Sequence, residues 1–386
     1  MKWSLIRRKL ARVDRAIDKA IADADIPGAV VLARMPHQGE EIEYASARGL
    51  AVARPERLPM TRSTLFDLAS LTKPLATTSA ILLLVDEGTL DLDDPVAKHL
   101  PHFAERDKEG VTLRHLLTHS SGLKPWRAFH EVLIEKERKT GETWLGNPAS
   151  RDLIVERVLR SGLVHEPGKA AVYGDLDFIV LGALVEALSH QPLDVFCRER
   201  IFEPLGLQDT FFVPLGGEAT LPDAMKRRFA ATENCSWRER ILWGEVHDPN
   251  AWCMGGVAGH AGLFSSAEDV MRFARTLLDV WHGRSQALPQ AVLRGFTERQ
   301  ELPPDSDWAL GWDTPTPGAS SSGQHFGARS IGHLGFTGTS LWIDLEREVV
   351  IVMLTNRIHQ VAKRSRFELR PRVHDLILEA FAAGCG

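Results

Sequence analysis

The sequence predicts an α+β fold in which one antiparallel sheet is built from strands near both ends of the chain. Two observations carry this prediction. Strand-like runs occur toward the two ends, and the patterns between them are mostly helical. Helices at the two termini flank the sheet, and a mainly helical region is inserted between its halves. Such an arrangement leaves a cleft where the sheet meets the helical region, and we expect the chemistry there.

The first elements supply the N-terminal half of the sheet. The basic segment 1–28 predicts an amphipathic helix, because apolar residues recur near helical spacing at Leu5, Leu10, Val13, Ile17 and Ile21. Two strands follow at 28–35 and 41–53, and the polar turn PHQGEE lies between them. We expect the two strands to pair as a hairpin.

The middle of the chain is helical and its end returns to strands. Helical patterns cover 76–87, 112–118, 151–161, 175–189, 193–203 and 267–281. Loops rich in Gly and Pro occupy 212–223 and 302–329. Strands at 339–346 and 348–357 and a closing helix at 372–384 complete the pattern. We therefore expect a single domain, 1–386, with a sheet subdomain of about 1–75 and 265–386 and a helical subdomain of about 76–264.

Composition excludes several classes of protein. The chain has 386 residues, 44% hydrophobic and 25% charged, which is ordinary for a protein with a large core. A net charge of −5 without a Lys/Arg cluster gives no reason to expect a nucleic-acid partner. The longest purely apolar runs, AILLLV and VVIVML, are far too short to span a membrane.

The cysteines and the N-terminal segment bear on location. The four scattered cysteines form no C-x-x-C pair and no zinc spacing, so we expect no metal and no cofactor. Scattered thiols fit a reducing compartment. The N-terminal segment lacks the apolar core of a signal peptide. We expect a cytoplasmic protein, or a periplasmic one if a leader precedes this sequence.

The segment ASLTKPLAT at 69–77 places Ser70 and Lys73 at positions i and i+3, on one face of a helix. A serine hydroxyl becomes a nucleophile when a neighbouring base takes its proton. Lysine can be that base once its pKa falls, and burial and a helix N-terminus both act in that direction. We therefore expect an uncharged Lys73. Taken alone, the spacing also fits an N-cap serine followed by a solvated lysine.

Two further segments support a catalytic interpretation. Tyr173, one of only two tyrosines, precedes a long apolar helix, where its hydroxyl can project into the cleft and pass a proton to a leaving group. Packing of a loop onto the helical region is the alternative. In SIGHLGFTGTSLWIDLE, at 330–346, three glycines let a strand edge approach a ligand, and backbone N–H groups there can bind an oxyanion. His333 lies on the same edge and can orient the substrate.

Together these segments resemble the serine β-lactamase and penicillin-binding-protein superfamily. The match is closest to the branch of class C β-lactamases, esterases and D-stereospecific peptidases. It rests on Ser70-Leu71-Thr72-Lys73, Tyr173-Gly174-Asp175 and His333-Leu334-Gly335, in that order. The flanking segments GTLDLDDPVAKHLPHF (88–103), TLRHLLTHSSGL (112–123), IFEPLGLQDTFF (201–212) and GGVAGHAGLFSSAEDVMRFARTLL (255–278) are similar as well. The resemblance covers about residues 25–357.

The resemblance implies a role for each matched position. Ser70 is then the acylated nucleophile and Lys73 its base. Tyr173 serves the leaving group and later activates the deacylating water. The N–H groups of Ser70 and Phe336 form the oxyanion hole. His333 and Gly335 hold the first and last positions of a motif that is often Lys-Thr-Gly.

Two departures from the family pattern shape the expected substrate. His333 replaces a permanently charged lysine, so anchoring of a substrate carboxylate becomes weaker and dependent on pH. Asp175 stands where class C β-lactamases usually have an asparagine, and an ionised aspartate only accepts hydrogen bonds. We therefore favour a small ester, or an amide that carries a free amine, over efficient antibiotic hydrolysis.

The functional prediction is a serine hydrolase that forms an acyl-enzyme on an ester, amide or β-lactam bond of a small molecule. The alternative is a penicillin-binding or regulatory protein on the same fold with little or no turnover. The oligomeric state and the natural substrate are not predicted.

Several other residues have a structural and a functional interpretation. His115 and His119 have the i, i+4 spacing of two metal ligands, but no H-E-x-x-H motif, so we expect structural roles. His247 and Asp248 either line the cleft or stitch their own loop. Cys253 is expected to be buried. Some of the loop tryptophans are expected to wall a substrate pocket, from the set Trp126, Trp144, Trp243, Trp252 and Trp312.

Overall fold

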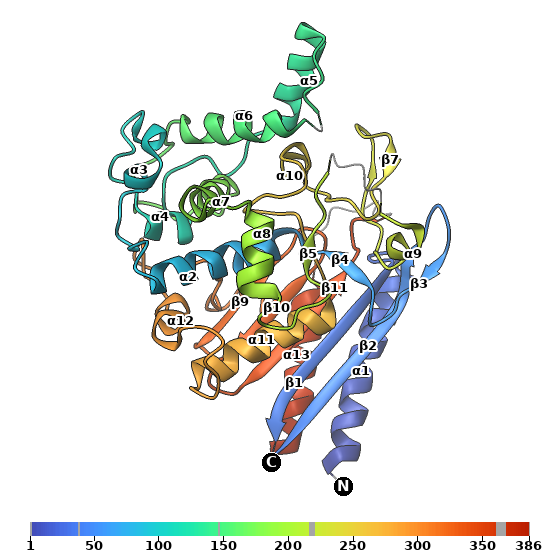
Figure 1. The fold of residues 1–386 in the computed structure, drawn as a ribbon. Helices are drawn as coiled ribbons and strands as arrows, with labels where there is room; N and C mark the ends of the chain where they lie inside the picture. Colours follow the sequence, from blue (N-terminus) through green and yellow to red (C-terminus); the bar gives the residue numbers. More distant parts are fainter. Residues whose placement is uncertain (1, 38, 146, 216–220, 360–367, 386) are drawn as a thin grey trace.

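A computed structural model describes residues 2–37, 39–145, 147–215, 221–359 and 368–385. Its centre is a six-stranded antiparallel sheet in the order β3-β2-β1-β11-β10-β9 (Figure 1). The strands are β1 Gly28–His37, β2 Glu40–Val52, β3 Leu58–Pro59, β9 Ser330–Leu334, β10 Ser340–Asp344 and β11 Val349–Thr355. Strand β1 pairs with β11 in the middle of the sheet, so the two ends of the chain build one sheet, as the sequence predicts.

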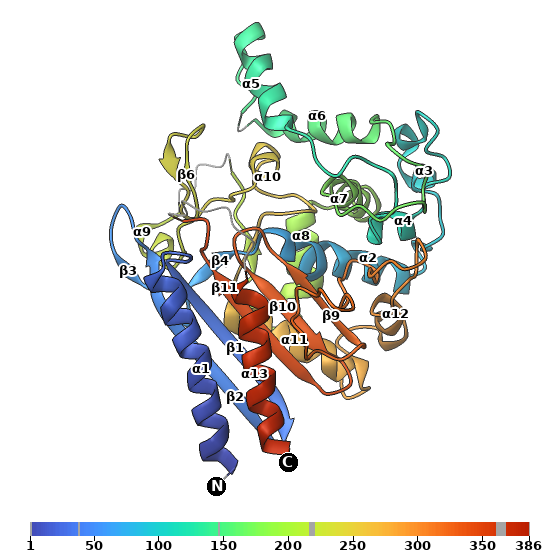
Figure 2. The ribbon, with the colours of Figure 1, turned by 180° about the vertical axis from the view of Figure 1, so that it is seen from behind.

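Both faces of this sheet are buried. Along β1, Val30 and Leu32 face one hydrophobic core, whereas Ala29, Val31 and Ala33 face a second core. The second core is covered by the terminal helices, α1 Lys2–Ala22 and α13 Leu369–Cys385, which pack side by side (Figure 2). The two helices flank the sheet as expected.

The other face carries the inserted region. Helix α11, Ala267–Trp281, packs on β1 and β11, and its bounds match the predicted 267–281. Its N-cap is Ser266, whose Oγ accepts a hydrogen bond from the Asp269 N–H at 3.2 Å. The remaining helices are α2 Ser79–Asp86, α3 Val96–His99, α4 Leu113–Leu117, α5 Phe129–Thr140, α6 Pro148–Leu159, α7 Leu176–Ser189, α8 Leu193–Cys197, α9 Asp223–Lys226, α10 Pro249–Cys253 and α12 Gln290–Phe296.

A small second sheet, which the sequence did not predict, leads into the Ser70 segment. It has the order β4-β8-β5, from Leu65–Asp67, Leu263–Ser266 and Phe211–Phe212. A separate hairpin joins β6 Asn234–Cys235 to β7 Arg240–Ile241. These strands have two to four residues, too short to show a period of two.

The chain after β4 does not enter an α-helix directly. Residues Ala69–Leu71 form a 3₁₀ turn, Lys73–Thr78 a π-helix, and only then does α2 begin. Ser70 and Lys73 thus lie at the irregular start of a buried helix, a place where π segments often mark functional sites.

In the part of the chain that the structure describes, no single helix is long and apolar enough to cross a membrane. Leu176–Ser189 and Leu193–Phe202 meet the test only as a pair bent by 78°.

Candidate active site

Three predicted groups from distant parts of the chain meet at one point. The Lys73 Nζ lies 3.1 Å from the Ser70 Oγ and 2.8 Å from the Tyr173 hydroxyl. Lys73 is fully buried, whereas Ser70 is partly exposed. Ser70 and Tyr173 line a cavity of about 710 Å³ that Asp175, His333 and Phe336 also line. All the predicted site residues therefore lie in or directly beneath one cavity.

The expectation of an uncharged Lys73 is wrong for this structure. Burial acts to lower its pKa, but the Asp175 carboxylate, whose Oδ1 lies 2.8 Å from Nζ, raises the pKa above its usual range. Lys73 is therefore an ammonium ion paired with the Asp175 carboxylate. The aspartate at position 175 is visible in the sequence, but its effect on the pKa of Lys73 depends on the distance between the two side chains, which only the fold determines.

Tyr173 keeps its hydroxyl inside the site although the residue is 41% exposed. The hydroxyl contacts Lys73, and the ring stacks on Trp308 with centroids 5.6 Å apart and planes 13° apart. Burial raises the pKa of the phenol, so Tyr173 is protonated at neutral pH. The exposed part of Tyr173 is thus ring, and the reactive atom faces Lys73.

A buried polar cluster holds Tyr173 from behind. The His119 ring meets the Tyr173 ring edge-on at 4.7 Å, and His119 Nδ1 accepts a hydrogen bond from the Gly174 N–H at 3.3 Å. Asp177 lies 3.2 Å from the same Nδ1. Burial lowers the pKa of His119 to about 3 and raises that of Asp177 to about 8, so the pair is uncharged at neutral pH. This agrees with the structural role expected for His119. His115 caps α4 through Thr112.

The turn between β9 and β10 is fastened to the Ser70 segment. Thr337 Oγ1 donates to the Asp67 carbonyl at 2.8 Å, and Thr339 Oγ1 donates to the Leu68 carbonyl at 3.0 Å. Gly335 is required here, because a Cβ would lie 2.4 Å from the Leu68 oxygen. Within the described residues, neither the Ser70 N–H nor the Phe336 N–H donates a recorded hydrogen bond. Two backbone donors are thereby available for an oxyanion.

Asp67 holds the backbone next to Ser70, and it was not among the residues that the sequence singled out. Its Oδ1 accepts from the Ala69 N–H at 2.8 Å, and its Oδ2 accepts from the His247 N–H at 2.6 Å. Ala69 has φ +48°, a conformation that costs an L-residue about 1 kcal/mol. Asp67 therefore holds a strained residue immediately before Ser70. An acidic residue three positions before the serine was the available signal.

His333 is a buried, neutral residue, which corrects the expected pH-dependent anchor. Burial and the nearby Lys73 charge lower its pKa well below the usual value. Its Nδ1–H donates to the Leu334 carbonyl at 2.9 Å, and its Nε2 has no recorded partner among the described residues. His333 can accept a hydrogen bond from substrate, but it supplies no positive charge near neutral pH.

Positive charge comes instead from two arginines that the sequence did not single out. Arg357 follows β11 and Arg370 lies in the first turn of α13, and both line the cavity. Burial and the charge of Arg357 lower the pKa of Arg370 to about 9, so the guanidinium still carries its charge at neutral pH. Nothing in the local sequence distinguishes these arginines from surface ones.

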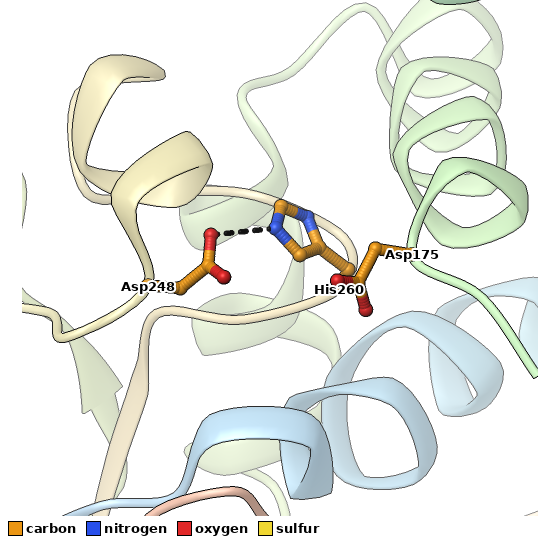
Figure 3. Close-up of side chains that lie close together, drawn as sticks. All are labelled: Asp175, Asp248 and His260. Carbon is orange, nitrogen blue, oxygen red and sulfur yellow. Dashed lines mark hydrogen bonds and ion pairs between the residues drawn. The ribbon is translucent and has the colours of Figure 1, made fainter. Parts of the chain in front are cut away.

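The predicted loop at 247–248 lines the cavity, and it is also held by hydrogen bonds of its own Asp248 side chain. His260 Nε2 lies 2.9 Å from Asp248 Oδ1 (Figure 3). The same oxygen accepts a hydrogen bond from the Ala251 N–H at 2.7 Å. Burial acts to raise the pKa of Asp248, but His260 lowers it below its usual range. Asp175, Asp248 and His260 place ligand atoms within 4.8 Å of one another. Because Lys73 and His260 already pair with the two carboxylates, we assign the cluster to the polar wall of the site.

Two further expectations concern the cysteines and tryptophans. Cys253 is fully buried, as predicted, and burial raises the pKa of its thiol to about 12. Of the five tryptophans considered, Trp126 lines the cavity. Trp308, which the sequence did not single out, lines it as well.

Known proteins are similar to this chain in sequence and in fold. The family model described as "Beta-lactamase" matches residues 13–372. A putative D-alanyl-D-alanine carboxypeptidase of Escherichia coli (strain K12) is 34% identical over 91% of this chain and 83% of its own length. One of Salmonella agona (strain SL483) is 33% identical over 78% of this chain and 71% of its own length.

Solved structures agree on the fold. EstCE1, a hydrolase with promiscuous acyltransferase activity, matches with a TM-score of 0.69 and 24% identity over 97% of this chain and 98% of its own. A penicillin-binding protein homologue from Caulobacter crescentus matches with a TM-score of 0.70 and 21% identity over 97% of each chain. The predicted α+β fold and the resemblance are confirmed. The chain belongs to the beta-lactamase family and is a serine hydrolase.

Proposed function

We propose that Ser70 is the nucleophile of an acyl-enzyme mechanism in which Lys73 takes the serine proton. The observation that carries the proposal is the convergence of the Ser70 Oγ, the Lys73 Nζ and the Tyr173 hydroxyl within hydrogen-bond distance beside a cavity. A nucleophile in contact with its base is the arrangement that such chemistry requires. The two backbone donors of Ser70 and Phe336 are the proposed oxyanion hole.

Lys73 has to lose a proton before it can act as a base. Its partner Asp175 is the acceptor we propose, because substrate that fills the cavity excludes water, and a dry site disfavours the charged ammonium–carboxylate pair. The proton moves from Nζ to the Asp175 carboxylate, and the neutral amine then takes the Ser70 proton as Oγ attacks the carbonyl carbon. Tyr173, which is protonated, passes its proton to the leaving group and recovers one from Lys73.

We further propose that the substrate carries a carboxylate next to the scissile amide or ester. Arg357 and Arg370 support this, because they bring positive charge to the cavity where His333 brings none. The relatives named putative D-alanyl-D-alanine carboxypeptidases point to a peptide ending in a D-amino acid. Asp175 supplies no donor for the amide side chain of a β-lactam, so efficient antibiotic hydrolysis is not favoured.

The nucleophile can be tested with p-nitrophenyl acetate. Wild-type protein should release a burst of nitrophenolate, and Ser70→Ala should abolish it. Lys73→Ala should slow acylation by roughly 10²–10⁴-fold, the usual contribution of a general base. Equal, slow release from wild type and Ser70→Ala would exclude the proposed nucleophile.

A second measurement separates the enzyme from a binding or regulatory protein. An ester, a D-amino-acid amide and a cephalosporin should be compared side by side, with a fluorescent penicillin as the label. Turnover of the ester or amide supports the hydrolase. Stable labelling of Ser70 without turnover of any of the three substrates would favour a penicillin-binding or regulatory role.

A further inference from the structure

Among the side chains that the structure describes, the exposed large aromatic ones lie at the cavity. Trp126, Tyr173 and Phe336 are 46%, 41% and 65% exposed, and all three line the cavity. Apolar surface left in water is costly, and its concentration in one place marks a binding site. Trp126 comes from the helical region, whereas Phe336 comes from the turn that follows β9.

Each exposed ring has another ring packed against it. Phe336 stacks on the His247 imidazole with centroids 5.4 Å apart and planes 18° apart, in the same manner as Tyr173 on Trp308. The Trp126 ring packs against the His130 ring, with centroids 6.2 Å apart and planes 53° apart. Such contacts fix the orientation of a ring and leave another part of it free to meet a ligand.

The backbone on both sides of Trp126 is also held. The Pro125 carbonyl accepts a hydrogen bond from the Asp175 N–H at 2.7 Å. On the other side, the fully buried Asn250 donates to the Arg127 carbonyl at 2.8 Å and accepts from the Phe129 N–H at 3.1 Å. An indole whose backbone is held on both sides and whose ring is exposed at the cavity loses less entropy when it binds a ligand than one on a free loop.

We propose that these rings form a subsite for an aromatic ring of the substrate, with Trp126 and Phe336 as its specificity-determining side chains. The inference rests on the proposed hydrolase function and narrows it to ring-bearing esters or amides. A flat apolar ring can stack on the exposed indole and phenyl faces while its carbonyl carbon lies at Ser70. Small aliphatic substrates reach Ser70 but leave these faces in water.

The test compares three small esters that differ in whether they carry a phenyl ring and on which side of the ester bond the ring lies. Ethyl acetate has none, ethyl phenylacetate has one on the acyl side, and benzyl acetate has one on the alcohol side. Acid release by the full chain is followed in a pH-stat. We expect a higher kcat/KM for at least one ring ester than for ethyl acetate. Trp126→Ala should reduce that preference roughly tenfold, the value of a stacking contact. Trp126→Phe, which keeps a ring, should retain most of it.

Two further variants make the result specific. Phe336→Leu removes the ring but keeps the backbone N–H, and it should also reduce the preference. Val164→Ala is the matched control, because Val164 is 53% exposed but does not line the cavity. The inference is wrong if wild type shows no preference for a ring ester, or if Trp126→Ala keeps the full preference.

Two other outcomes separate different failures. Light scattering is measured on the same samples. If Trp126→Ala has a lower molar mass in solution than wild type but keeps the ester preference, the exposed rings serve self-association, and the proposed subsite is wrong. If wild type hydrolyses none of the three esters and Ser70 resists a fluorophosphonate label, the hydrolase function itself fails, and this inference fails with it.

Discussion

A single carboxylate sets the charge of Lys73. Asp175 lies 2.8 Å from Lys73 and outweighs the effect of burial on the lysine pKa. At the same position an asparagine would leave burial as the dominant influence, and the amine would then be largely neutral. The choice between Asp and Asn at one site therefore decides whether the enzyme rests with an ion pair or with a free base.

This argument predicts the effect of Asp175→Asn on the pH profile. Because the ammonium form loses its partner, the pKa of Lys73 should fall, and the acid limb of kcat/KM should move to lower pH. Initial rates with p-nitrophenyl acetate across the pH range give this limb. Asp269→Asn is the control, since Asp269 is another buried carboxylate, but it does not line the cavity and accepts hydrogen bonds from Asp209 and Thr210. An acid limb that stays in place would show that Asp175 does not control the lysine.

At the scale of elements, the short strand β4 organises the site. Its last residue, Asp67, receives hydrogen bonds from the Ala69 and His247 N–H groups through its side chain and from Thr337 through its carbonyl. Three loops from separate parts of the sequence are thus joined at one buried residue. The strained Ala69 and the turn that bears Phe336 both depend on this junction.

We predict that Asp67→Asn slows acylation more than it weakens the fold. The amide nitrogen of Asn cannot accept from a backbone N–H, so one buried donor loses its partner, which costs about 1–3 kcal/mol. The fluorophosphonate labelling rate of Ser70 should fall roughly 10–100-fold.

Asp269→Asn is the matched control for this prediction. Asp269 is another buried carboxylate that accepts a backbone N–H, from Asp209 at 2.6 Å, but it does not line the cavity. It should lower the melting temperature and leave the labelling rate of the folded protein unchanged. If the labelling rate of Ser70 falls equally in Asp67→Asn and Asp269→Asn, Asp67 contributes only to the stability of the fold.

At the scale of the whole molecule, the two hydrophobic cores lie on opposite faces of the sheet and differ in their relation to the cavity. The cavity lies on the side of the first core, whereas the second core joins α1 and α13 to the far face of the sheet. Helix α13 also carries Arg370, which lines the cavity, so we expect damage to reach the site only through global stability when it lies on α1.

Ile17→Ala tests this separation. Ile17 is fully buried in the second core, and its truncation should lower the free energy of unfolding by about 2–5 kcal/mol. Urea denaturation measures the loss, and kcat/KM at 25 °C should stay near the wild-type value. Leu5→Ala on the same helix is the control, because Leu5 is 40% exposed and should change stability little. A large loss of kcat/KM in folded Ile17→Ala would refute the separation.

Much of the fold could be predicted because long periodic segments carry strong signals. The terminal strands, the 267–281 helix and the shared sheet follow from periodicity and from their order in the chain. The β4-β8-β5 sheet and the helix at Phe129–Thr140 could not, since the strands are short and the helix buries only a narrow face. The subdomain bounds and the cytoplasmic location stay predictions.

The residues that share the cavity could be named together because the family resemblance depends on short motifs in a given order along the chain, and their catalytic roles stay predictions. Their charge states could not be predicted, since the pKa values of Lys73 and His333 depend on burial and on neighbours distant in sequence. Arg370 and Asp67 were missed for the same reason. Asp67 accepts a hydrogen bond from His247, which is far away in the sequence, and Arg370 reaches the cavity from the C-terminal helix.

The central pairing of β1 with β11 has a consequence during synthesis. A ribosome makes Ser70, Lys73 and Tyr173 well before it makes Phe336 and Arg370. A nascent chain halted between these points holds a hydroxyl and an amine, but it has neither the later oxyanion donor nor a closed sheet to keep them together. On the proposed mechanism, Ser70 therefore becomes able to react only after the strands at the end of the chain have joined the sheet.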